Sequence, residues 1–465
     1  MNFKSSDFTA RMDRFAALFL AVAFVVAGWK IANRPPAVNF AANAQQAAPS
    51  TNARSGTPKA MPATSQPPQQ ISPDGRFRFD AGFVSSAPGQ AVHAASMVEL
   101  RDGRLRAVWF SGSREGAGDV SIKSSVMDAA SLRWGEESTL FDRRQIQQGL
   151  WRYVKKIGNP VIARAPDGSL LLWMVNVSLG GWAGSSVSWA RSTDEGATWS
   201  EPRRLVTSPF LNISTLVKGA PIFYENGEIG LPVYHEFVAK FAEILRINAQ
   251  GRVLEKVRIP GSQTSLQPVV LVAGPRQAQV YMRSGNATAL MTSATDDAGK
   301  TWTAAHASTW PNPDSALAAV VTGTGQQWLA LNPGPKNREV LALLQTDIGG
   351  SFDGVSPWVV ESSATPQARL SVGDYERLLG IELKATGASE AQIQSYVASA
   401  KRQLCGVDAC SQEYSYPYLL QSRDGYLHLI YTWHRTRIKH VRLDPLQALQ
   451  TVPVAPAAIS HAPAN

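Results

Sequence analysis

The chain has 465 residues, of which 44% are hydrophobic, and its 45 Lys and Arg outnumber its 36 Asp and Glu to give a formal net charge of +9. This hydrophobic content can bury a large core, although length alone does not separate two ordinary domains from one repeat fold. The basic balance favours an acidic glycan or an anionic membrane surface as a partner, and it also fits a generally basic exported protein. The sequence carries no basic-aromatic motif for nucleic acid, so we expect no partner of that class.

The N-terminal region predicts export. Residues 15–29 form an apolar run with basic residues on both sides, a pattern typical of an export signal or a short membrane anchor. We favour the anchor because the small-residue pattern at 42–44 lies too far beyond the run for ordinary signal cleavage; a cleaved signal is the alternative. We therefore expect a cytoplasmic segment at 1–14, a single-pass anchor at 15–33 in a bacterial-type inner membrane, and a body exported to the periplasm or the cell exterior.

Two segments have the composition of disordered chain. Residues 34–74 are rich in Pro, Ala, Gln and Ser without a periodic apolar pattern, which predicts a flexible tether, and the similar tail at 446–465 is expected to be disordered. The only two cysteines, Cys405 and Cys410, can form a local disulfide in an exported protein or remain free thiols. They cannot complete a tetrahedral metal site without a nearby histidine, and no motif requires a metal or another cofactor.

Residues 75–445 repeat one pattern six times: a polar opening, an apolar strand, a turn and a second strand. Asp-Gly or Asn-Gly pairs form most of the turns and are strong hairpin signals. The turns mostly lie about 50–65 residues apart, enough for four strands in each unit, so we predict an all-β, six-bladed β-propeller. A strand near 77–83 is expected to close the ring. The units open near His93, Asn159, Lys218, Gln267, Asp314 and Ser415.

The interval before the last unit is longer than the others because it contains residues 366–410. Within it, residues 371–404 are the only stretch with a convincing helical spacing of apolar residues, interrupted at Gly387. We interpret this segment as a helical hairpin inserted between blades five and six. Both blades are complete without it, so we expect the insertion to be dispensable for the fold.

Residues 192–199, Ser-Thr-Asp-Glu-Gly-Ala-Thr-Trp, fit a tight hairpin turn in which each residue type has a physical role. Asp194 can bond the turn amides, Gly196 can take a positive φ, and Trp199 can fold back over the hairpin. The pattern recurs at 295–302 with Thr in place of Ser, and a degenerate third copy follows. It resembles the Asp box, or bacterial neuraminidase repeat, of the sialidase superfamily, which implies a sialidase-like propeller.

The first strand of each propeller blade lines the central channel, so the residues that open the units should meet at one end of it, together with the ends of the second strands. An imidazole near a carboxylate suits proton transfer, an arginine can hold a carboxylate bidentately, and an aromatic ring can stack on a sugar. The alternative for each is a hydrogen-bonded strand-end residue without a functional role. The substrate-binding candidates are His93, Arg114, Lys218, Gln267, Arg283, Arg338, Tyr416, Trp433, His434 and Arg435, and the catalytic candidates are Tyr414, Glu115, Asp119, His235 and Glu236.

The resemblance to sialidases implies roles for some of these residues. Sialidases use three arginines to hold the substrate carboxylate, an aspartate as acid/base, and a tyrosine nucleophile that a glutamate activates. Their tyrosine lies in a Tyr-Ser step that opens the last blade, and Tyr414 begins a similar step. Arg283 and Arg338 resemble the second and third arginines, and Glu115 or Asp119 lies in the region that resembles the acid/base.

Two positions depart from the sialidase pattern. His93 stands where sialidases carry the first arginine, and Gln267 stands where they carry the activating glutamate. Because an amide cannot take a proton from a phenol, the strict catalytic set is incomplete. We therefore keep three hypotheses: an exo-sialidase-like glycoside hydrolase acting on an acidic or surface glycan, a polysaccharide lyase on the same fold, and a non-catalytic glycan-binding propeller.

Overall fold

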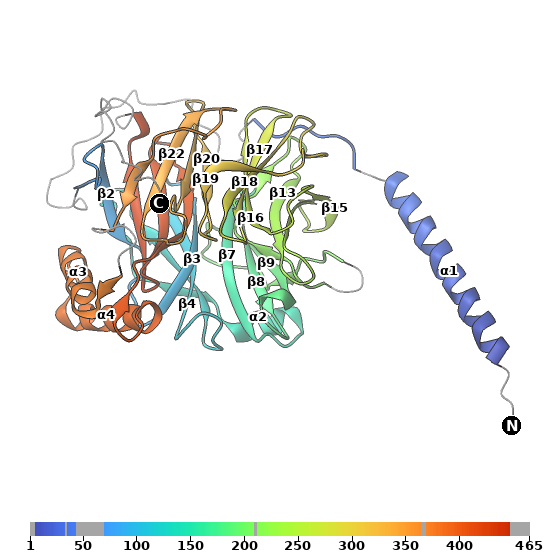
Figure 1. The fold of residues 1–465 in the computed structure, drawn as a ribbon, viewed down its shortest axis with the longest axis horizontal. Helices are drawn as coiled ribbons and strands as arrows, with labels where there is room; N and C mark the ends of the chain where they lie inside the picture. Colours follow the sequence, from blue (N-terminus) through green and yellow to red (C-terminus); the bar gives the residue numbers. More distant parts are fainter. Residues whose placement is uncertain (1–4, 33–34, 43–68, 209–211, 364–368, 447–465) are drawn as a thin grey trace, which may run out of the picture. The chain divides into compact units, whose positions relative to one another are not determined.

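The computed structural model describes residues 5–32, 35–42, 69–208, 212–363 and 369–446. The chain divides into two compact units, Met1–Ala37 and Val38–Asn465, and all described strands belong to the second (Figure 1). The tail expected to be disordered, 446–465, lies almost wholly outside the described residues.

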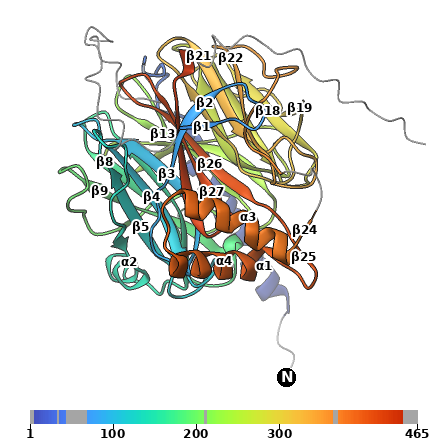
Figure 2. The same cartoon turned by 90° about the vertical axis from the view of Figure 1, so that its left-hand side faces the viewer.

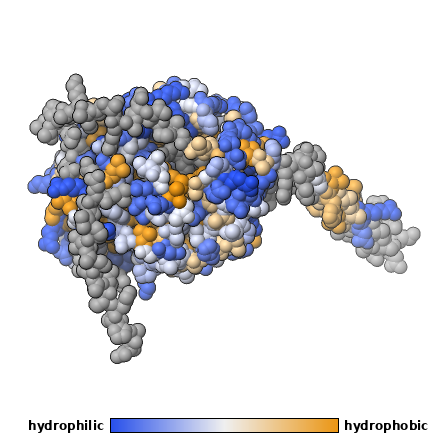
Figure 3. All heavy atoms as spheres, turned by 90° about the horizontal axis from the view of Figure 1, so that it is seen from above, coloured by the Kyte–Doolittle hydropathy of each residue, from blue (hydrophilic) through white to orange (hydrophobic). Residues whose placement is uncertain are grey.

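The first unit is one helix, α1 (Ser5–Ala32). Its described apolar side chains, among them Phe15, Phe19 and Phe24, are exposed (Figure 3). Among the described residues, no helix is long and apolar enough to cross a membrane. The anchor expected at 15–33 stays a prediction from the sequence.

The second unit is a six-bladed β-propeller whose blades are antiparallel sheets (Figure 1). Blade one contains β3 (Ala91–Glu99), β4 (Leu105–Gly112), β5 (Ser121–Met127) and β6 (Ser138–Phe141). Blade two contains β7 (Lys156–Arg164), β8 (Leu170–Val177), β9 (Ser185–Ser192) and β10 (Arg203–Arg204). Blade three contains β11 (Leu216–Val217), β12 (Ile222–Phe223), β13 (Ile229–His235), β14 (Phe241–Ile247) and β15 (Val253–Arg258). Two short helices, α2 (Arg143–Leu150) and η1 (Trp182–Gly184), lie in the connections.

Blade four contains β16 (Ser265–Val272), β17 (Ala278–Ser284), β18 (Ala289–Thr295) and β19 (His306–Pro311). Blade five contains β20 (Ala318–Val321), β21 (Gln326–Leu331), β22 (Leu341–Asp347) and β23 (Trp358–Glu361). Blade six joins β26 (Tyr414–Gln421), β27 (Leu427–Trp433) and β28 (Arg437–Leu443) to β2 (Arg78–Phe83) and β1 (Gln69–Ile71). The expected closing strand is thus confirmed, because β2 pairs antiparallel with β28.

The middle strands of the blades are buried on both faces, because neighbouring blades pack against each other. Every residue of β8, Leu-Leu-Leu-Trp-Met-Val-Asn-Val, is buried, and so is every residue of β27. Such strands read as continuous apolar runs rather than as a strict polar and apolar alternation. The core therefore lies between the blades, and polar side chains collect at the strand ends.

Both complete Asp-box motifs form the hairpin turn that the sequence predicts. In the first, Ser192 Oγ accepts a hydrogen bond from Gly196 N at 2.8 Å, and Asp194 accepts one from Thr198 N at 2.9 Å. Gly196 has a φ of 83°, a conformation that residues with a side chain rarely adopt. The second copy repeats both hydrogen bonds, with Thr295 in place of Ser192. The motif therefore stabilises a turn, since its polar side chains bond within the turn itself.

Part of the expected tether is ordered. Phe40 is 1% exposed, packs its ring on Tyr224 with centroids 5.3 Å apart, and donates its backbone N–H to Pro275 O at 2.8 Å. A uniformly flexible segment over 34–74 is therefore the wrong expectation, because a buried aromatic side chain and paired backbone groups hold this part of it. Residues 43–68 of the expected tether lie outside the described residues.

The helical hairpin expected between blades five and six is present. It comprises β24 (Leu370–Ser371), α3 (Val372–Ala385), α4 (Glu390–Leu404) and β25 (Ala409–Cys410). A disulfide joins Cys405 to Cys410. Of the two alternatives left open by the sequence, a local disulfide or two free thiols, the structure therefore has the disulfide.

The insertion contributes to the core of the propeller. Figure 2 shows α3 and α4 beside blade six, and their side chains Tyr375, Leu379 and Tyr396 share one buried cluster with Trp433 of β27. This shared core argues against the expectation that the insertion is dispensable, because its removal would expose the apolar side chains that it covers.

Replacement of Leu383 tests this shared core. Leu383 on α3 is fully buried, so Leu383→Ala should lower the free energy of unfolding by about 2–5 kcal/mol. Ile381→Ala is the matched control on the same helix, because Ile381 is 66% exposed, and it should change that free energy by less than about 0.5 kcal/mol. Urea denaturation followed by tryptophan fluorescence measures both variants. Equally small effects would contradict a structural role for the insertion.

Candidate functional site

Three inner strands each contain a residue with a positive φ at a point where the strand pairing is irregular, near the same end of the propeller axis. We call this local change in the direction of the side chain a backbone reversal. Asn159 of β7, Gln267 of β16 and Tyr416 of β26 each precede a proline and have φ of 38°, 49° and 54°. The pairing of each strand with its neighbour shifts register there. A residue before proline normally adopts an extended conformation, and strained backbone of this kind is concentrated at functional sites. The sequence signal for this feature is the recurrence of a polar residue followed by proline at equivalent places in three units.

The hydroxyl oxygen of Tyr416 accepts two hydrogen bonds. Gln267 Nε2 donates to it at 3.1 Å and Arg283 Nη1 donates at 3.2 Å. The same Arg283 nitrogen donates to Gln267 Oε1 at 3.0 Å, which fixes the amide orientation, because the oxygen must face the guanidinium. Two N–H donors, one of them cationic, thus point at the phenolic oxygen and would stabilise negative charge on it.

A second tyrosine extends this cluster into blades two and three. Tyr234 OH lies 3.3 Å from Gln267 Nε2 and 3.3 Å from Asn159 Nδ2, so its oxygen accepts from both amides. Burial, reinforced by the charges of Tyr416 and Glu236, raises the pKa of Tyr234 well above its ordinary value. Tyr234 therefore stays protonated at neutral pH and acts as a hydrogen-bonding support.

Carboxylates surround Arg283. Asp314 Oδ1 accepts from Arg283 Nε at 2.6 Å. Burial disfavours the charge of Arg283, but the attraction of Tyr416 and Asp314 outweighs it and raises the pKa of the guanidinium. Burial raises the pKa of the Glu236 carboxyl group. The charge of Arg283 opposes this increase, and the charge of Asp314 adds to it. Glu236 therefore retains a proton to a higher pH than an exposed glutamate does.

Glu413 holds two further arginines. It accepts from Arg435 Nε at 2.9 Å and pairs with Arg338 Nη1 at 3.4 Å, while Ser415 Oγ donates to it at 2.6 Å. Burial would raise the pKa of Glu413, but the attraction of Arg435 and Arg338 outweighs burial and lowers it. The other end of Arg435 pairs with Glu115 at 3.3 Å, and Glu115 is 39% exposed. This ion-pair chain runs from the buried side of the site towards solvent.

His93 packs on the ring of Tyr416, with ring centroids 4.1 Å apart. Burial lowers the pKa of His93 well below its ordinary value, and the charges of Arg435, Arg338 and Arg283 add to this effect. Among the described residues, no hydrogen-bond partner reaches its buried Nδ1. The site therefore contains a neutral imidazole beside the phenol.

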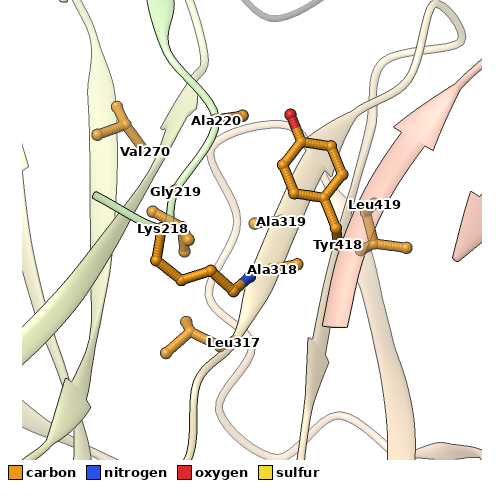
Figure 4. A pocket seen from close by; sticks show the side chains of 10 residues that line it. Lys218, Gly219, Ala220, Val270, Leu317, Ala318, Ala319, Tyr418 and Leu419 are labelled. Atoms are coloured by element: carbon orange, nitrogen blue, oxygen red, sulfur yellow. The ribbon is translucent and has the colours of Figure 1, made fainter. Parts of the chain in front are cut away.

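Lys218 lines a pocket together with Tyr418 of blade six (Figure 4). Its Nζ donates to Pro417 O at 2.5 Å and lies 5.7 Å from the centroid of the Tyr418 ring. Burial lowers the pKa of Lys218 to about 7. The residue was expected to bind substrate, but its contact with the peptide next to Tyr416 makes it a support for the backbone reversal there.

The structure corrects the choice of site tyrosine. Tyr414 was expected to be the nucleophile, but it is buried in the core of blade six, where its ring lies 5.0 Å from that of His434. Trp433 and His434, expected to bind substrate, lie in the same interior region, and His434 Nδ1 is 2.9 Å from Tyr375 OH. Residues two apart on a regular strand share a face, whereas the backbone reversal at Tyr416 turns that side chain away from the direction of Tyr414.

Other expected residues lie apart from the cluster. His235 pairs with Glu243 at 3.2 Å and stacks on Phe241, so it faces away from Glu236 and Tyr234, as alternation along a strand requires. The expected proton-transfer pair of His235 with Glu236 is therefore not formed. Within the loop after β4, Asp119 accepts two hydrogen bonds from Ser113, and Arg114 is exposed.

The cluster thus combines ten expected or unit-opening residues with two that were not among the candidates from the sequence. The missed residues are Tyr234 and Glu413, which lie one position away from a named candidate and carry no motif of their own. Among the described residues, no group of three or more His, Cys, Asp or Glu could hold a metal ion. The cluster brings together His93, Glu115, Asn159, Tyr234, Glu236, Gln267, Arg283, Asp314, Arg338, Glu413, Tyr416 and Arg435.

Comparison with known proteins identifies the repeat. A family model described as a BNR repeat-like domain matches residues 103–429. None of the curated proteins matches the chain significantly.

Solved structures share the fold at low identity. A protein of unknown function from Dyadobacter fermentans DSM 18053 is similar, with a TM-score of 0.57 and 12% identity over 78% of this chain and 97% of that one. The Hadza microbial sialidase Hz136 has a TM-score of 0.56 and 14% identity over 77% and 66% of the two chains. The intramolecular trans-sialidase from Ruminococcus gnavus has a TM-score of 0.55 and 12% identity over 80% and 97%. These similarities confirm the expected sialidase-like propeller fold.

Replacement of the shared carboxylate tests the ion-pair chain. Glu413→Gln should lower the free energy of unfolding by about 1.5–3 kcal/mol, because two arginines lose a charged hydrogen-bond partner. Glu115→Gln is the matched control on the exposed end of Arg435 and should cost less than about 1 kcal/mol. Urea denaturation at pH 7 compares them. If Glu115→Gln proved the more damaging change, Glu413 would not be the residue that holds the arginines.

Buried histidines predict acid-sensitive stability. Burial lowers the pKa of His93, His428, His434 and His440, to about 3 for His428 and His434. Unfolded histidines take up protons near pH 6.5 whereas these stay neutral when folded, so stability should fall below that pH by up to about 1.4 kcal/mol per pH unit for each. Urea denaturation across pH 7.5 to 5 measures the slope. His428→Gln should reduce the slope, and His306→Gln, at an exposed position, should leave it unchanged; equal slopes in the two variants would refute the assignment.

Proposed function

The chain belongs to the BNR repeat-like domain family, and from this premise we propose that it is a glycoside hydrolase acting on an acidic glycan. The observation that carries the proposal is the Tyr416 oxygen held by Arg283 and Gln267. Two further arginines, Arg338 and Arg435, lie close enough for their charges to act on His93 beside it. A phenol with cationic donors in an arginine-rich cluster is suited to attack on a sugar that carries a carboxylate.

In the proposed reaction, Tyr416 oxygen forms a bond to the anomeric carbon while the glycosidic carbon–oxygen bond breaks. The phenolic proton passes to solvent water as this bond forms, and the same oxygen regains a proton from water when the sugar is released. Arg283 and Gln267 stabilise the negative charge that the phenolic oxygen develops. Glu236, whose pKa is raised by burial, supplies the proton to the leaving oxygen. Water then attacks the glycosyl-tyrosine, returns a proton to the carboxylate and releases the sugar. Arg338 and Arg435 hold the substrate carboxylate.

A second candidate function is a polysaccharide lyase. The observation that favours it is the neutral His93 against Tyr416, with an unpartnered Nδ1. A neutral imidazole can remove the proton α to a uronate carboxylate while arginine stabilises the resulting charge. In that case the glycosidic bond breaks by elimination and no water is consumed. Binding of a glycan without turnover is the third outcome.

We also propose that the propeller functions outside the cytoplasm, in the periplasm or at the cell exterior. The disulfide between Cys405 and Cys410 supports this location, because oxidising compartments are where such bonds persist. The basic residues that precede the N-terminal apolar segment support the same location independently, because this order is typical of export signals.

The two neighbouring tyrosines give a matched test. Tyr416→Phe should lower kcat on a fluorogenic sialoside or uronide by about 10³-fold or more, with substrate binding retained, because the reacting oxygen is lost. Tyr414→Phe should retain turnover, because Tyr414 lies in the core of blade six. Full activity of Tyr416→Phe would exclude the phenol as nucleophile.

Product analysis separates the three functions. A hydrolase in water enriched in oxygen-18 incorporates the label into the released sugar, and a lyase yields an unsaturated uronate that absorbs ultraviolet light without incorporating label. Activity lost on His93→Gln but kept in Tyr416→Phe would favour the lyase. If the unmodified protein and every variant bind the glycan but leave it chemically unchanged, the protein is a glycan-binding protein.

A further inference from the structure

A second groove lies between the helical insertion, blade six and blade one. It has a volume of about 480 Å³, within the range of about 300–1,000 Å³ that is usual for small-molecule sites. Its walls come from β2, from residues 132–134, from the turn between α3 and α4, and from Arg437 of β28. None of these residues belongs to the Tyr416 cluster, so the groove is a separate feature.

Arg437 is a buried cation at the wall of this groove. It is 8% exposed, and its guanidinium lies between two aromatic rings, 4.2 Å from the centroid of Phe83 and 4.3 Å from that of Tyr396. Its Nε donates to Ser85 O at 2.9 Å, and Nη2 donates to the same oxygen. A guanidinium has five N–H donors, and no described residue accepts from the Nη1 end of this one.

No described carboxylate forms an ion pair with Arg437. Glu137 is the carboxylate whose charge acts on it, but Glu137 Oε2 is held by the backbone N–H groups of Ser86 and Ala87 at 2.8 and 3.1 Å. Burial accordingly lowers the pKa of Arg437 to about 10. Buried charges in proteins are usually paired, so an anion in the groove would complete this environment.

The remaining wall suits a sugar ring. Phe83, Trp134 and Tyr396 line the groove, and the indole N–H of Trp134 is buried without an acceptor among the described residues. Aromatic faces pack on the apolar face of a sugar, while the planar guanidinium fits a carboxylate bidentately. We propose that this groove binds a carboxylate-bearing sugar, with Arg437 on the carboxylate and the aromatic side chains against the ring. The proposal does not depend on catalysis at Tyr416.

Gly82 offers a way to fill the groove without touching Arg437. Gly82 lies on β2 in the wall of the groove, and a Cβ placed on it would meet nothing within 4 Å. Gly82→Ile therefore inserts a branched side chain that strands accept well, and Gly82→Ala is the matched control that leaves the groove open. Arg437→Lys keeps the charge but loses the planar fork.

Isothermal titration of the full chain with N-acetylneuraminic acid and with D-glucuronic acid tests the proposal. Gly82→Ile and Arg437→Lys should each weaken one binding event at least tenfold, Gly82→Ala should not, and D-glucose should give no such event. Unfolding midpoints confirm that Gly82→Ile is folded, so the test stands even if Arg437→Lys is unstable. Tyr416→Phe should leave this event intact.

Three results would overturn the proposal. The first is binding of both acidic sugars unchanged by Gly82→Ile. The second is equal binding of D-glucose, which would remove the role of the carboxylate. The third is equal competition by inorganic phosphate, which would reduce the groove to a general anion site. Failure of turnover at Tyr416 with retained groove binding would contradict only the proposed hydrolase, so the two proposals fail separately.

Discussion

The arrangement of the candidate site depends on backbone reversals next to proline in the inner strands. A regular strand at the axis would need every backbone N–H paired with its neighbour, but proline has no N–H and so tolerates an irregular ladder at that point. The reversal changes which way the preceding side chain points. Asn159, Gln267 and Tyr416, from three different blades, thereby meet through the hydroxyl groups of two tyrosines. Similar local chemistry on separate blades thus builds one cluster.

Charge balance then stabilises the cluster. Arg283, Arg338 and Arg435 each have a carboxylate partner within the protein, and Glu413 serves two of them. Because these arginine side chains are already held in place by their partners, they lose little conformational entropy when a ligand binds. This is the advantage of a preorganised site. The same pairing means that a ligand carboxylate must compete with Asp314 or Glu413. Specificity for acidic ligands would therefore come from geometry more than from net positive charge, and the formal charge of the whole chain is a poor guide to it.

The sequence predicts the fold better than the site. Hairpin turns and Asp boxes are local, so the six blades and the helical hairpin follow from nearest-neighbour chemistry. The choice between Tyr414 and Tyr416 depends on the positive φ at Tyr416, and the sequence signals it only through the proline that follows. Glu413 was missed for a similar reason, since its importance comes from Arg338, 75 positions away in the chain. The sequence was sufficient to predict which residues open each unit. To predict which of their side chains come into contact, the path of the backbone must also be known.

Closure of the ring joins the two ends of the propeller domain. Strand β2 pairs with β28, and Arg442 Nη1 bonds Asp80 Oδ2 across 362 positions of sequence. While a ribosome is still making the chain, β2 can pair with β1 but lacks its other neighbour, β28, so the last blade forms only after synthesis has passed β28. Pairing across such a separation is slow, because loop closure must precede the contacts that reward it. A protein built this way reaches its closed ring only when both ends of the domain are present, so loss of either terminal strand would leave the last blade incomplete.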